Sequence, residues 1–340
     1  MSSPSVSVIL PVFNAEPFIG CALDSVLRSS LADIEVIVID DGSTDHSADI
    51  AQKRAQTDAR VRIKRFSRKG IANALNEGIA LASSPVIARM DADDICDPRR
   101  FELQLACLRQ NPDMAVVSCL VRPVSDASLS AGNRRYVEWV NQSISSEQIA
   151  RDLYIESPLP HPSVMFRASA VRSLGGYRRY DGPEDYDLWL RMSDAGMKFC
   201  KVPAVLLLWR FHHANLTRSD PRYRKNAFLR RKIEHVARQV RRGRLAHGRK
   251  IRICGPGLAG KRLEQGLVEA GFPVEGFVDV NPARRSDTCS GLPVWNTAAV
   301  GKRDKNRFYF CAVRRWDSWP EIRRLFKERN KTEGIDYLIL

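Results

Sequence analysis

The sequence contains no long hydrophobic run, and its eight cysteines include no CxxC pair. Its longest apolar stretches, such as 202–209, fall well short of the roughly 18 residues that a membrane-spanning helix needs, so we expect no transmembrane segment. The first residues lead directly into a strand-like segment at 6–10, without the basic region or cleavage site of a signal peptide, so we expect no secretion. Scattered cysteines are typical of buried positions in a reducing compartment, which favours the cytosol.

The composition is that of a soluble globular protein, with 340 residues, 44% hydrophobic and 27% charged, which is long enough for two domains. Its formal charge of +15 is concentrated between Arg218 and Lys250. This segment contains 13 Lys or Arg residues and only two acidic residues, Asp220 and Glu234. Such a segment attracts polyanions, either an anionic membrane surface or a phosphorylated acceptor. No nucleic acid is expected, because no helix-turn-helix, zinc-finger or aromatic stacking pattern accompanies the charge. A solvated basic helix that links two domains is the alternative.

The first half of the chain alternates strand and helix patterns. Continuous apolar runs predict strands at 6–12, 34–39 and 61–66, and apolar residues at helical spacing predict helices at 16–28 and 71–81. Another helix, capped by Ser43 or Thr44, is expected to reach Gln56. Repeated βα units of this kind predict an α/β fold with a mostly parallel sheet.

An acidic motif follows the apolar run at 86–90. Asp91, Asp93 and Asp94 form it, and Asp41 follows the strand at 34–39. The carboxyl ends of parallel strands share one edge of the sheet, where ligands of open α/β folds bind. Carboxylates suit Mg²⁺ or Mn²⁺, whose coordination a substrate diphosphate completes. The alternative is a solvated acidic loop that precedes the helix near Pro98.

A second acidic pair, Glu184 and Asp185, follows Pro183 at a predicted helix start whose apolar face includes Trp189. The pair is a candidate for acid-base chemistry, although acids also favour helix starts through the macrodipole. His161 precedes a proline, so we expect an extended backbone that points its ring into a cleft; a hydrogen-bonded structural histidine is the alternative.

Taken together, these motifs resemble those of the family 2 inverting glycosyltransferases of the GT-A fold, in order and approximate spacing. The resemblance covers residues 5–217 and is closest to bacterial enzymes that build surface polysaccharides. The motifs that carry it lie at 6–14, 39–45, 74–78, 90–94, 161–163 and 184–189.

The resemblance implies a donor site that binds a nucleoside diphosphate sugar. Its expected residues, with Asp41 accepting hydrogen bonds from the base, are Pro11, Val12, Phe13, Asn14, Asp41, Asn76, Asp91, Asp93 and Arg210. Asp93 would be the direct ligand of the divalent metal, Mg²⁺ or Mn²⁺. Asp91 and Asp94 would support it or bind the ribose and sugar of the donor, and Asp91 is the second candidate metal ligand.

The resemblance also assigns the acceptor side. Asp185 matches the catalytic base, which takes the proton of the acceptor hydroxyl, and Glu184 lies beside it. His161, Trp189 and His212 are the expected acceptor or cleft residues. For Arg210 and His212, which match an Arg-x-His segment of the family, a diphosphate or metal contact and a structural role at the domain edge remain equal alternatives.

The C-terminal region begins again with a strand at 250–254, followed by Gly255, Gly257 and Gly260, a helix to about 270, and Asp279 after the next strand. This spacing is the dinucleotide-binding fingerprint and predicts a small Rossmann-like βαβ module. Three roles remain open: a structural or regulatory module, a site for a nucleotide or sugar nucleotide, and a redox enzyme.

We therefore predict three parts: a GT-A glycosyltransferase domain at 1–217, a basic helical linker at 218–249 and a Rossmann-like module at 250–340. The expected activity is metal-dependent inverting transfer of a sugar to a glycan or lipid-linked acceptor, in the cytoplasm or peripherally at the inner face of the cell membrane. The alternatives are a catalytically inactive nucleotide-binding regulator or assembly protein, and a sugar-nucleotide oxidoreductase.

Overall fold

The computed structural model divides the chain into two compact units. The first comprises Met1–Leu153 and Ser157–Tyr223, and the second comprises Tyr154–Glu156 and Arg224–Leu340. The residues that the structure describes are 3–125, 129–179, 182–213, 215, 220, 223, 225–279, 288–302, 304–313 and 318–340. The predicted boundary between 217 and 218 lies outside the described residues.

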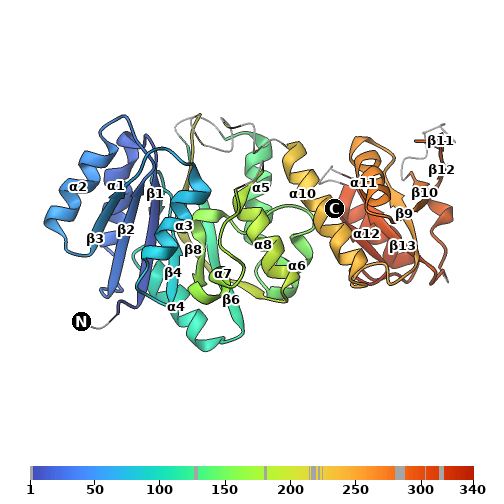
Figure 1. Cartoon of the computed structure of the whole chain (residues 1–340). Helices are drawn as coiled ribbons and strands as arrows, with labels where there is room; N and C mark the ends of the chain where they lie inside the picture. Colours follow the sequence, from blue (N-terminus) through green and yellow to red (C-terminus); the bar gives the residue numbers. More distant parts are fainter. Residues whose placement is uncertain are drawn as a thin grey trace. The chain divides into compact units, whose positions relative to one another are not determined.

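An eight-stranded sheet forms the centre of the first unit (Figure 1). Its strands, in spatial order, are β3 (Val61–Arg65), β2 (Ile34–Asp40), β1 (Val6–Val12), β4 (Val86–Arg89), β7 (Met165–Arg167), β6 (Met114–Ser125), β8 (Lys198–Phe211) and β5 (Ile95–Cys96). The pairs from β3 to β4 are parallel, as is β6 with β8. Strand β7 is antiparallel to both of its neighbours, and β5 is antiparallel to β8. The predicted α/β fold with a mostly parallel sheet is confirmed.

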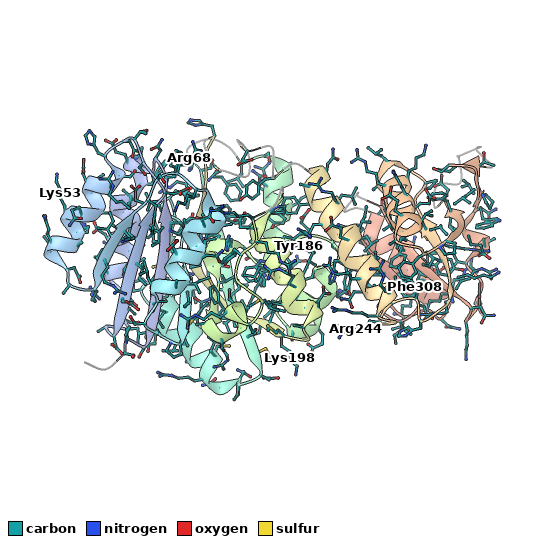
Figure 2. All side chains as sticks on the ribbon, in the orientation of Figure 1. Lys53, Arg68, Tyr186, Lys198, Arg244 and Phe308 are labelled. Atoms are coloured by element: carbon teal, nitrogen blue, oxygen red, sulfur yellow. The ribbon has the colours of Figure 1, made fainter. Side chains whose placement is uncertain are left out.

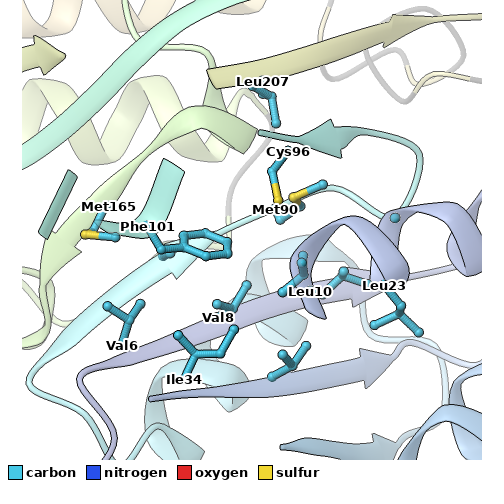
Figure 3. Close-up of a cluster of buried hydrophobic side chains, with 14 of the residues drawn as sticks. Val6, Val8, Leu10, Leu23, Ile34, Met90, Cys96, Phe101, Met165 and Leu207 are labelled. Atoms are coloured by element: carbon cyan, nitrogen blue, oxygen red, sulfur yellow. The ribbon is translucent and has the colours of Figure 1, made fainter. Parts of the chain in front are cut away.

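Helices cover both faces of this sheet. Each helix packs against it because apolar residues recur along one side of the helix. The helices are α1 (Glu16–Leu27), α2 (Ser47–Thr57), α3 (Ile71–Leu81), α4 (Arg100–Gln110), α5 (Ala131–Gln142), α6 (Ser146–Asp152), α7 (Ala168–Arg172) and α8 (Glu184–Asp194). The core between the sheet and α1 and α4 buries Val8, Leu10 and Phe101 completely (Figure 3). Burial of each such side chain stabilises the fold by about 1.5–3 kcal/mol.

The predicted cap of α2 is wrong, because this helix begins at Ser47. The side chain of Ser43 instead accepts a hydrogen bond from the Asn14 amide at 3.0 Å, and the Ser43 amide donates to Asp40 at 3.2 Å. Ser43 therefore joins the loops that follow β1 and β2. These loops form part of the sheet edge where ligands of this fold class bind.

The strand register brings the two predicted acidic motifs to one edge of the sheet. Val12 at the end of β1 lies opposite Asp40 in β2, and Ile9 lies opposite Arg89 at the end of β4. The residues after β2 and β4 therefore emerge at the same edge, on either side of β1. The prediction that Asp41 and the acidic motif at 91–94 lie at the same edge of the sheet is confirmed.

The second unit contains a six-stranded sheet in the order β11-β12-β10-β9-β13-β14. Its strands are β9 (Lys250–Cys254), β10 (Val274–Val278), β11 (Thr288–Cys289), β12 (Leu292–Trp295), β13 (Arg307–Cys311) and β14 (Tyr337–Ile339). Its helices are α10 (Lys225–Arg241), α11 (Leu258–Glu269) and α12 (Trp319–Glu328). From β12 to β14 all neighbouring strands are parallel. Counted along the chain without β11, these five strands have the Rossmann order 3-2-1-4-5.

Helix α10 packs within this second unit, although the sequence predicted a linker at 218–249. Val236 on α10 is fully buried in the same hydrophobic cluster as Ile253 on β9 and Leu263 on α11. Lys232 is also buried and donates a hydrogen bond to the carbonyl of Ile155. Across the described ranges, we find no helix with both the length and the hydrophobicity that crossing a bilayer requires.

Candidate active site

The loop after β4 gathers three carboxylates. One ligand atom from each of Asp91, Asp93 and Asp94 lies within 4.8 Å of the others. Burial and the charge of Asp93 raise the pKa of Asp94 well above its usual value. Its Oδ2 atom is buried and has no hydrogen-bond partner among the described residues. A hard divalent cation would satisfy this oxygen and offset the repulsion, so the donor set fits Mg²⁺ or Mn²⁺.

Arg89, the last residue of β4, forms an ion pair with Asp91. Its two terminal nitrogens contact both oxygens of Asp91 at 2.6 Å. Burial raises the pKa of Asp91 to about 6; Arg89 opposes this rise and the charge of Asp93 adds to it. We did not predict a role for Arg89, although a charged residue inside a buried strand was a signal for one, because such residues are almost always paired.

The end of β8 contacts the same loop. The backbone amide of Arg210 donates a hydrogen bond to Asp94 Oδ1 at 2.7 Å. Nε of the Arg210 side chain donates to the Asp93 carbonyl at 2.8 Å. His212 Nε2 and Asn215 Nδ2 both approach Asp93 Oδ2, at 2.8 and 3.1 Å. Arg210 and His212, predicted as a donor and a cleft residue, thus meet at the acidic loop. Asn215 was missed, since a single asparagine after a strand carries no recognisable pattern.

The predicted nucleotide residues lie on the loops that follow β1 and β2. Pro11 and Val12 are buried in the sheet edge, whereas Phe13 is 36% exposed. The guanidinium of Arg68, labelled in Figure 2, lies 3.9 Å from the centre of the Phe13 ring. An aromatic face beside a cation suits a planar base and its phosphates.

Two further donor candidates hold the backbone of neighbouring loops. Both oxygens of Asp41 accept backbone hydrogen bonds, from Lys69 at 2.7 Å and from Gly70 at 2.8 Å. Asn14 adopts a positive φ of 50° and its Oδ1 accepts a hydrogen bond from the Thr44 amide. The structure therefore places both candidates at the predicted edge and gives their side chains local partners there.

Asn76 of α3 makes both of its amide hydrogen bonds to a single residue, Tyr177. Its Nδ2 donates to the Tyr177 carbonyl and its Oδ1 accepts from the Tyr177 amide, both at 2.8 Å. Gly176, at a φ of +72°, has no room for a side chain, because a Cβ would lie 2.4 Å from Asn76 Oδ1. Asn76, predicted at the donor, thus holds the turn that carries Tyr177.

The second acidic centre lies at the start of α8, where the predicted helix start is confirmed. Glu184 is buried, with Oε1 3.4 Å from His161 Nδ1 and Oε2 accepting a hydrogen bond from the Tyr223 hydroxyl. The other ring nitrogen of His161 lies 2.9 Å from the Tyr177 hydroxyl. We did not predict site roles for Tyr177 or Tyr223, because these roles depend on contacts between segments that are distant in the sequence.

His161 is not extended as predicted, but begins a 3₁₀ turn over His161–Ser163. Gln104 of α4 contributes to this geometry, because its side-chain nitrogen donates to the Ser163 carbonyl at 2.8 Å. Trp189, also predicted at the cleft, is fully buried, and its ring meets the His161 ring edge-on at 6.0 Å between centroids. Its contact at this centre is therefore with His161.

The titration properties of this centre differ between its two carboxylates. Burial and the charge of Glu184 raise the pKa of Asp185 to about 7. Burial alone would raise the pKa of Glu184, but hydrogen bonds from His161 and Tyr223 lower it below its usual value. Burial and Arg89 lower the pKa of His161 to about 4, so this ring is neutral at pH 7. A carboxyl with a pKa near 7 is suited to general-base catalysis.

The C-terminal fingerprint residues surround the start of α11. Gly255, at a φ of +98°, makes the turn after β9 and packs against the end of β13. A Cβ on Gly260 would lie 2.0 Å from the Gly255 carbonyl oxygen, whereas one on Gly257 would meet nothing within 4 Å. Asp279 directly follows β10, the neighbour of β9. The predicted Rossmann-like arrangement of strand, turn and helix is therefore present.

Comparison with known proteins agrees with this fold. Residues 7–175 match the family described as "Glycosyl transferase family 2". The chain is 34% identical over 202 residues to the putative glycosyltransferase EpsE of Bacillus subtilis, covering 58% of this chain and 69% of EpsE. It is 29% identical over 204 residues to the amylovoran biosynthesis glycosyltransferase AmsE of Erwinia amylovora, covering 59% of this chain and 74% of AmsE.

Two solved structures share the fold. The mannosyltransferase PcManGT of Pyrobaculum calidifontis, in complex with GDP-Man and Mn²⁺, has a TM-score of 0.51 at 20% identity, covering 72% of this chain and 65% of its own. S. aureus TarS 1-349, in complex with UDP-GlcNAc, has a TM-score of 0.56 at 15% identity, covering 78% of this chain and 71% of its own.

The fold and the acidic centres together define a nucleotide-sugar-dependent glycosyltransferase of the GT-A type. The chain belongs to glycosyl transferase family 2, whose members invert the configuration of the transferred sugar. The enzyme class predicted from the sequence is confirmed, and the two alternative functions are not favoured.

Proposed function

We propose that the first unit transfers a sugar from a nucleoside diphosphate donor to a hydroxyl of a glycan or lipid-linked acceptor in bacterial surface polysaccharide synthesis. One observation carries this proposal: a carboxylate cluster suited to a divalent cation and a carboxyl with a pKa of about 7 both lie within the electrostatic reach of Arg89. Transfer with inversion needs these two elements, one to stabilise the leaving group and one to accept a proton.

Each centre has a separate role in the proposed reaction. Asp93, supported by Asp91 and Asp94, would hold Mg²⁺ or Mn²⁺, which would neutralise the charge that develops on the departing nucleoside diphosphate. Asp185 removes the proton from the acceptor hydroxyl as its oxygen forms a bond to the anomeric carbon. The bond from that carbon to the diphosphate oxygen breaks on the opposite face, and its electron pair leaves with the diphosphate. A single displacement of this kind inverts the anomeric centre.

A panel of nucleotide sugars tests this function. We expect the protein to release nucleoside diphosphate from at least one of UDP-GlcNAc, UDP-glucose, UDP-galactose and GDP-Man when Mn²⁺ or Mg²⁺ is present, and to lose this activity in excess chelator. The Asp185→Asn variant should bind the same donor and release about 10² to 10⁴ times less product. Release that is insensitive to chelator, or an unchanged rate in this variant, would contradict the assignment.

We also propose that the second unit attaches to an anionic membrane surface, because α10 and the turn after it expose Arg230, Arg241, Arg242 and Arg244. Each basic residue near such a surface contributes about 1 kcal/mol, so attachment should weaken with salt. Lys232, which is buried, is not a useful position for testing this proposal.

Co-sedimentation with phosphatidylglycerol vesicles tests the membrane proposal. We expect the variant with Arg241 and Arg242 changed to Glu to bind the vesicles more weakly than the natural protein does. The matched control changes exposed Lys53 and Arg109 of the first unit to Glu, which reverses the same amount of charge. Equal binding of both variants, or no binding of the natural protein at low salt, would exclude attachment through α10.

For the fingerprint of the second unit we propose a nucleotide ligand, with Asp279 positioned for a ribose hydroxyl and Gly257 leaving space for phosphate at the start of α11. Calorimetric titration with ADP, UDP and NAD⁺ tests this proposal. Gly257 has an ordinary backbone conformation, so Gly257→Val should keep the melting temperature and abolish binding. Absence of binding by the natural protein would leave the module with a structural role.

A further inference from the structure

Glu184 has both carboxylate oxygens occupied by groups that come from outside its own helix. His161 in the turn before β7 approaches Oε1 at 3.4 Å, and the hydroxyl of Tyr223 donates to Oε2. The residue is 6% exposed, so these two groups replace the water that would otherwise solvate its charge. A carboxylate held in this way is poorly placed to accept a proton from an acceptor hydroxyl.

The proton on His161 is assigned from its two partners. Tyr177 lies 2.9 Å from Nε2 and can donate its hydroxyl hydrogen there, because burial raises the pKa of this tyrosine and keeps it protonated. A neutral imidazole that accepts at Nε2 carries its proton on Nδ1, which faces Glu184. Asn76 fixes the backbone of Tyr177 with two hydrogen bonds. Helix α3 therefore positions Tyr177, which in turn contacts His161.

We propose that His161 and Tyr223 are positioning residues that hold Glu184 as an ionised carboxylate beside Asp185, so that Glu184 supplies a fixed negative charge and Asp185 alone takes the proton. This inference rests on the proposed function of the first unit and assigns distinct roles to the two acids of that site. The Asp185 carboxylate has a backbone partner in the Tyr186 amide, which donates to Oδ1 at 2.7 Å.

The charges around the pair support this division of roles. Glu184 on α8 raises the pKa of Asp185, and Arg89 on β4 opposes that rise. The charge of Glu184 also raises the pKa of Asp91. Removing the charge of Glu184 should therefore lower the pKa of Asp185, because the repulsion would be lost and only burial would continue to raise it.

Direct titration of Asp185 tests the inference without relying on turnover. Carboxyl ¹³C NMR of protein labelled at aspartate, with the Asp185→Asn spectrum to assign the resonance, should give a lower pKa for Asp185 in Glu184→Gln than in the natural protein. Tyr223→Phe should lower it less, because the carboxylate remains. Tyr186→Phe is the matched control: its hydroxyl bonds to the Leu153 carbonyl, and its loss should leave the titration of Asp185 unchanged.

The pH profile of donor turnover gives the second measurement, with release of nucleoside diphosphate from the most active donor of the panel between pH 5 and 9. We expect Glu184→Gln to keep a plateau within about tenfold of the natural protein and to move its acidic limb to lower pH, whereas Asp185→Asn loses about 10² to 10⁴ in rate on the plateau above pH 7. An unmoved ¹³C titration in Glu184→Gln, or a plateau rate reduced as much as that of Asp185→Asn, would overturn the inference. If the natural protein uses no donor, the proposed function fails, and the ¹³C titration still decides whether Glu184 sets the pKa of Asp185.

Discussion

Arg89 and Asp91 form a two-pronged ion pair at the end of β4, with both nitrogen-to-oxygen distances at 2.6 Å. The arginine side chain is 5% exposed and that of the aspartate is 31% exposed, so the pair has a buried cation and a carboxylate that still reaches the site. The charge of Arg89 also acts on Glu184 and Asp185. One buried guanidinium therefore offsets charge in both acidic centres.

The first prediction concerns this pair. We expect Arg89→Met to lower the free energy of unfolding by roughly 3 kcal/mol, because it leaves Asp91 beside two other carboxylates without its cation. Asp91→Asn should cost a comparable amount, since it leaves the buried guanidinium without its main partner. The double variant should lose less than the sum of the two single variants. Urea unfolding of all four proteins in chelator measures this coupling, and strictly additive losses would contradict it.

The second prediction concerns the metal. Asp93→Asn should reduce donor turnover on the order of 10²-fold at saturating Mn²⁺ and weaken Mn²⁺ binding in calorimetry, because an amide oxygen is a poorer ligand for a hard cation. The control is Asp113→Asn, which removes an exposed carboxylate paired with Lys198 at the start of β8, whereas the acidic loop contacts the opposite end of this strand. That control should keep both properties. Unchanged Mn²⁺ affinity in Asp93→Asn would remove Asp93 from the predicted ligands.

Much of the first unit could be predicted because strands such as β1 and β2 are buried on both faces and the helices carry one apolar side. The helix at 71–81 matches α3 in full, and the strand at 6–12 matches β1. The start of α2 could not be found, because Ser43 is a good capping residue that here bonds to Asn14 on another loop. Local sequence does not reveal competition of this kind from a segment 29 residues away.

The candidate site was predicted where residues lie in short motifs and missed where they do not. Asp91, Asp93 and Asp94 are adjacent in sequence and in space. Tyr177 and Tyr223, in contrast, contact His161 and Glu184, which lie 16 and 39 residues away from them in the sequence.

Asn76 shows the limit of transferring a role by motif. Its position in α3 is as expected, but the partner of its side chain lies 101 residues away in Tyr177. Only the fold reveals that pairing, because no periodicity or spacing relates the two positions.

The third prediction follows from the pKa of Asp185, which is about 7 in the folded protein against 3.8 for an unperturbed aspartate. Between about pH 4 and pH 7 the folded chain keeps a proton that the unfolded chain releases, so the free energy of unfolding falls as pH rises through this window and then levels off. Asparagine cannot ionise and keeps an oxygen for the Tyr186 amide. Asp185→Asn should therefore be more stable than the natural protein at pH 8.

We expect that gain to be about 1–2 kcal/mol, because Asp185 is partly exposed and water screens its charge. The difference should shrink toward pH 4, where both side chains are neutral. Chemical unfolding at pH 5 and pH 8 in chelator measures it. A variant less stable than the natural protein at pH 8 would show that the ionised carboxylate has stabilising contacts that outweigh its burial.

The last prediction compares two adjacent glycines in the turn before Tyr177. Gly175 and Gly176 have φ values of +75° and +72°, so alanine at either position should lose about 1 kcal/mol from the left-handed conformation. Their surroundings differ: a Cβ at 175 meets nothing within 4 Å, whereas one at 176 lies 2.4 Å from Asn76 Oδ1. Gly176→Ala should therefore also disturb the two hydrogen bonds between Asn76 and Tyr177, at a further cost of about 1–3 kcal/mol.

The same pair of variants separates stability from function. Tyr177 contacts His161, which contacts Glu184, so a displaced turn in Gly176→Ala should lower donor turnover at temperatures where the protein remains folded. Gly175→Ala has the same backbone strain without that contact and should keep the turnover of the natural protein. Thermal unfolding and nucleoside diphosphate release, measured on both variants, check the two effects separately. Equal turnover in both folded variants would mean that the Asn76 contact supports the fold alone and has no effect on the position of Glu184.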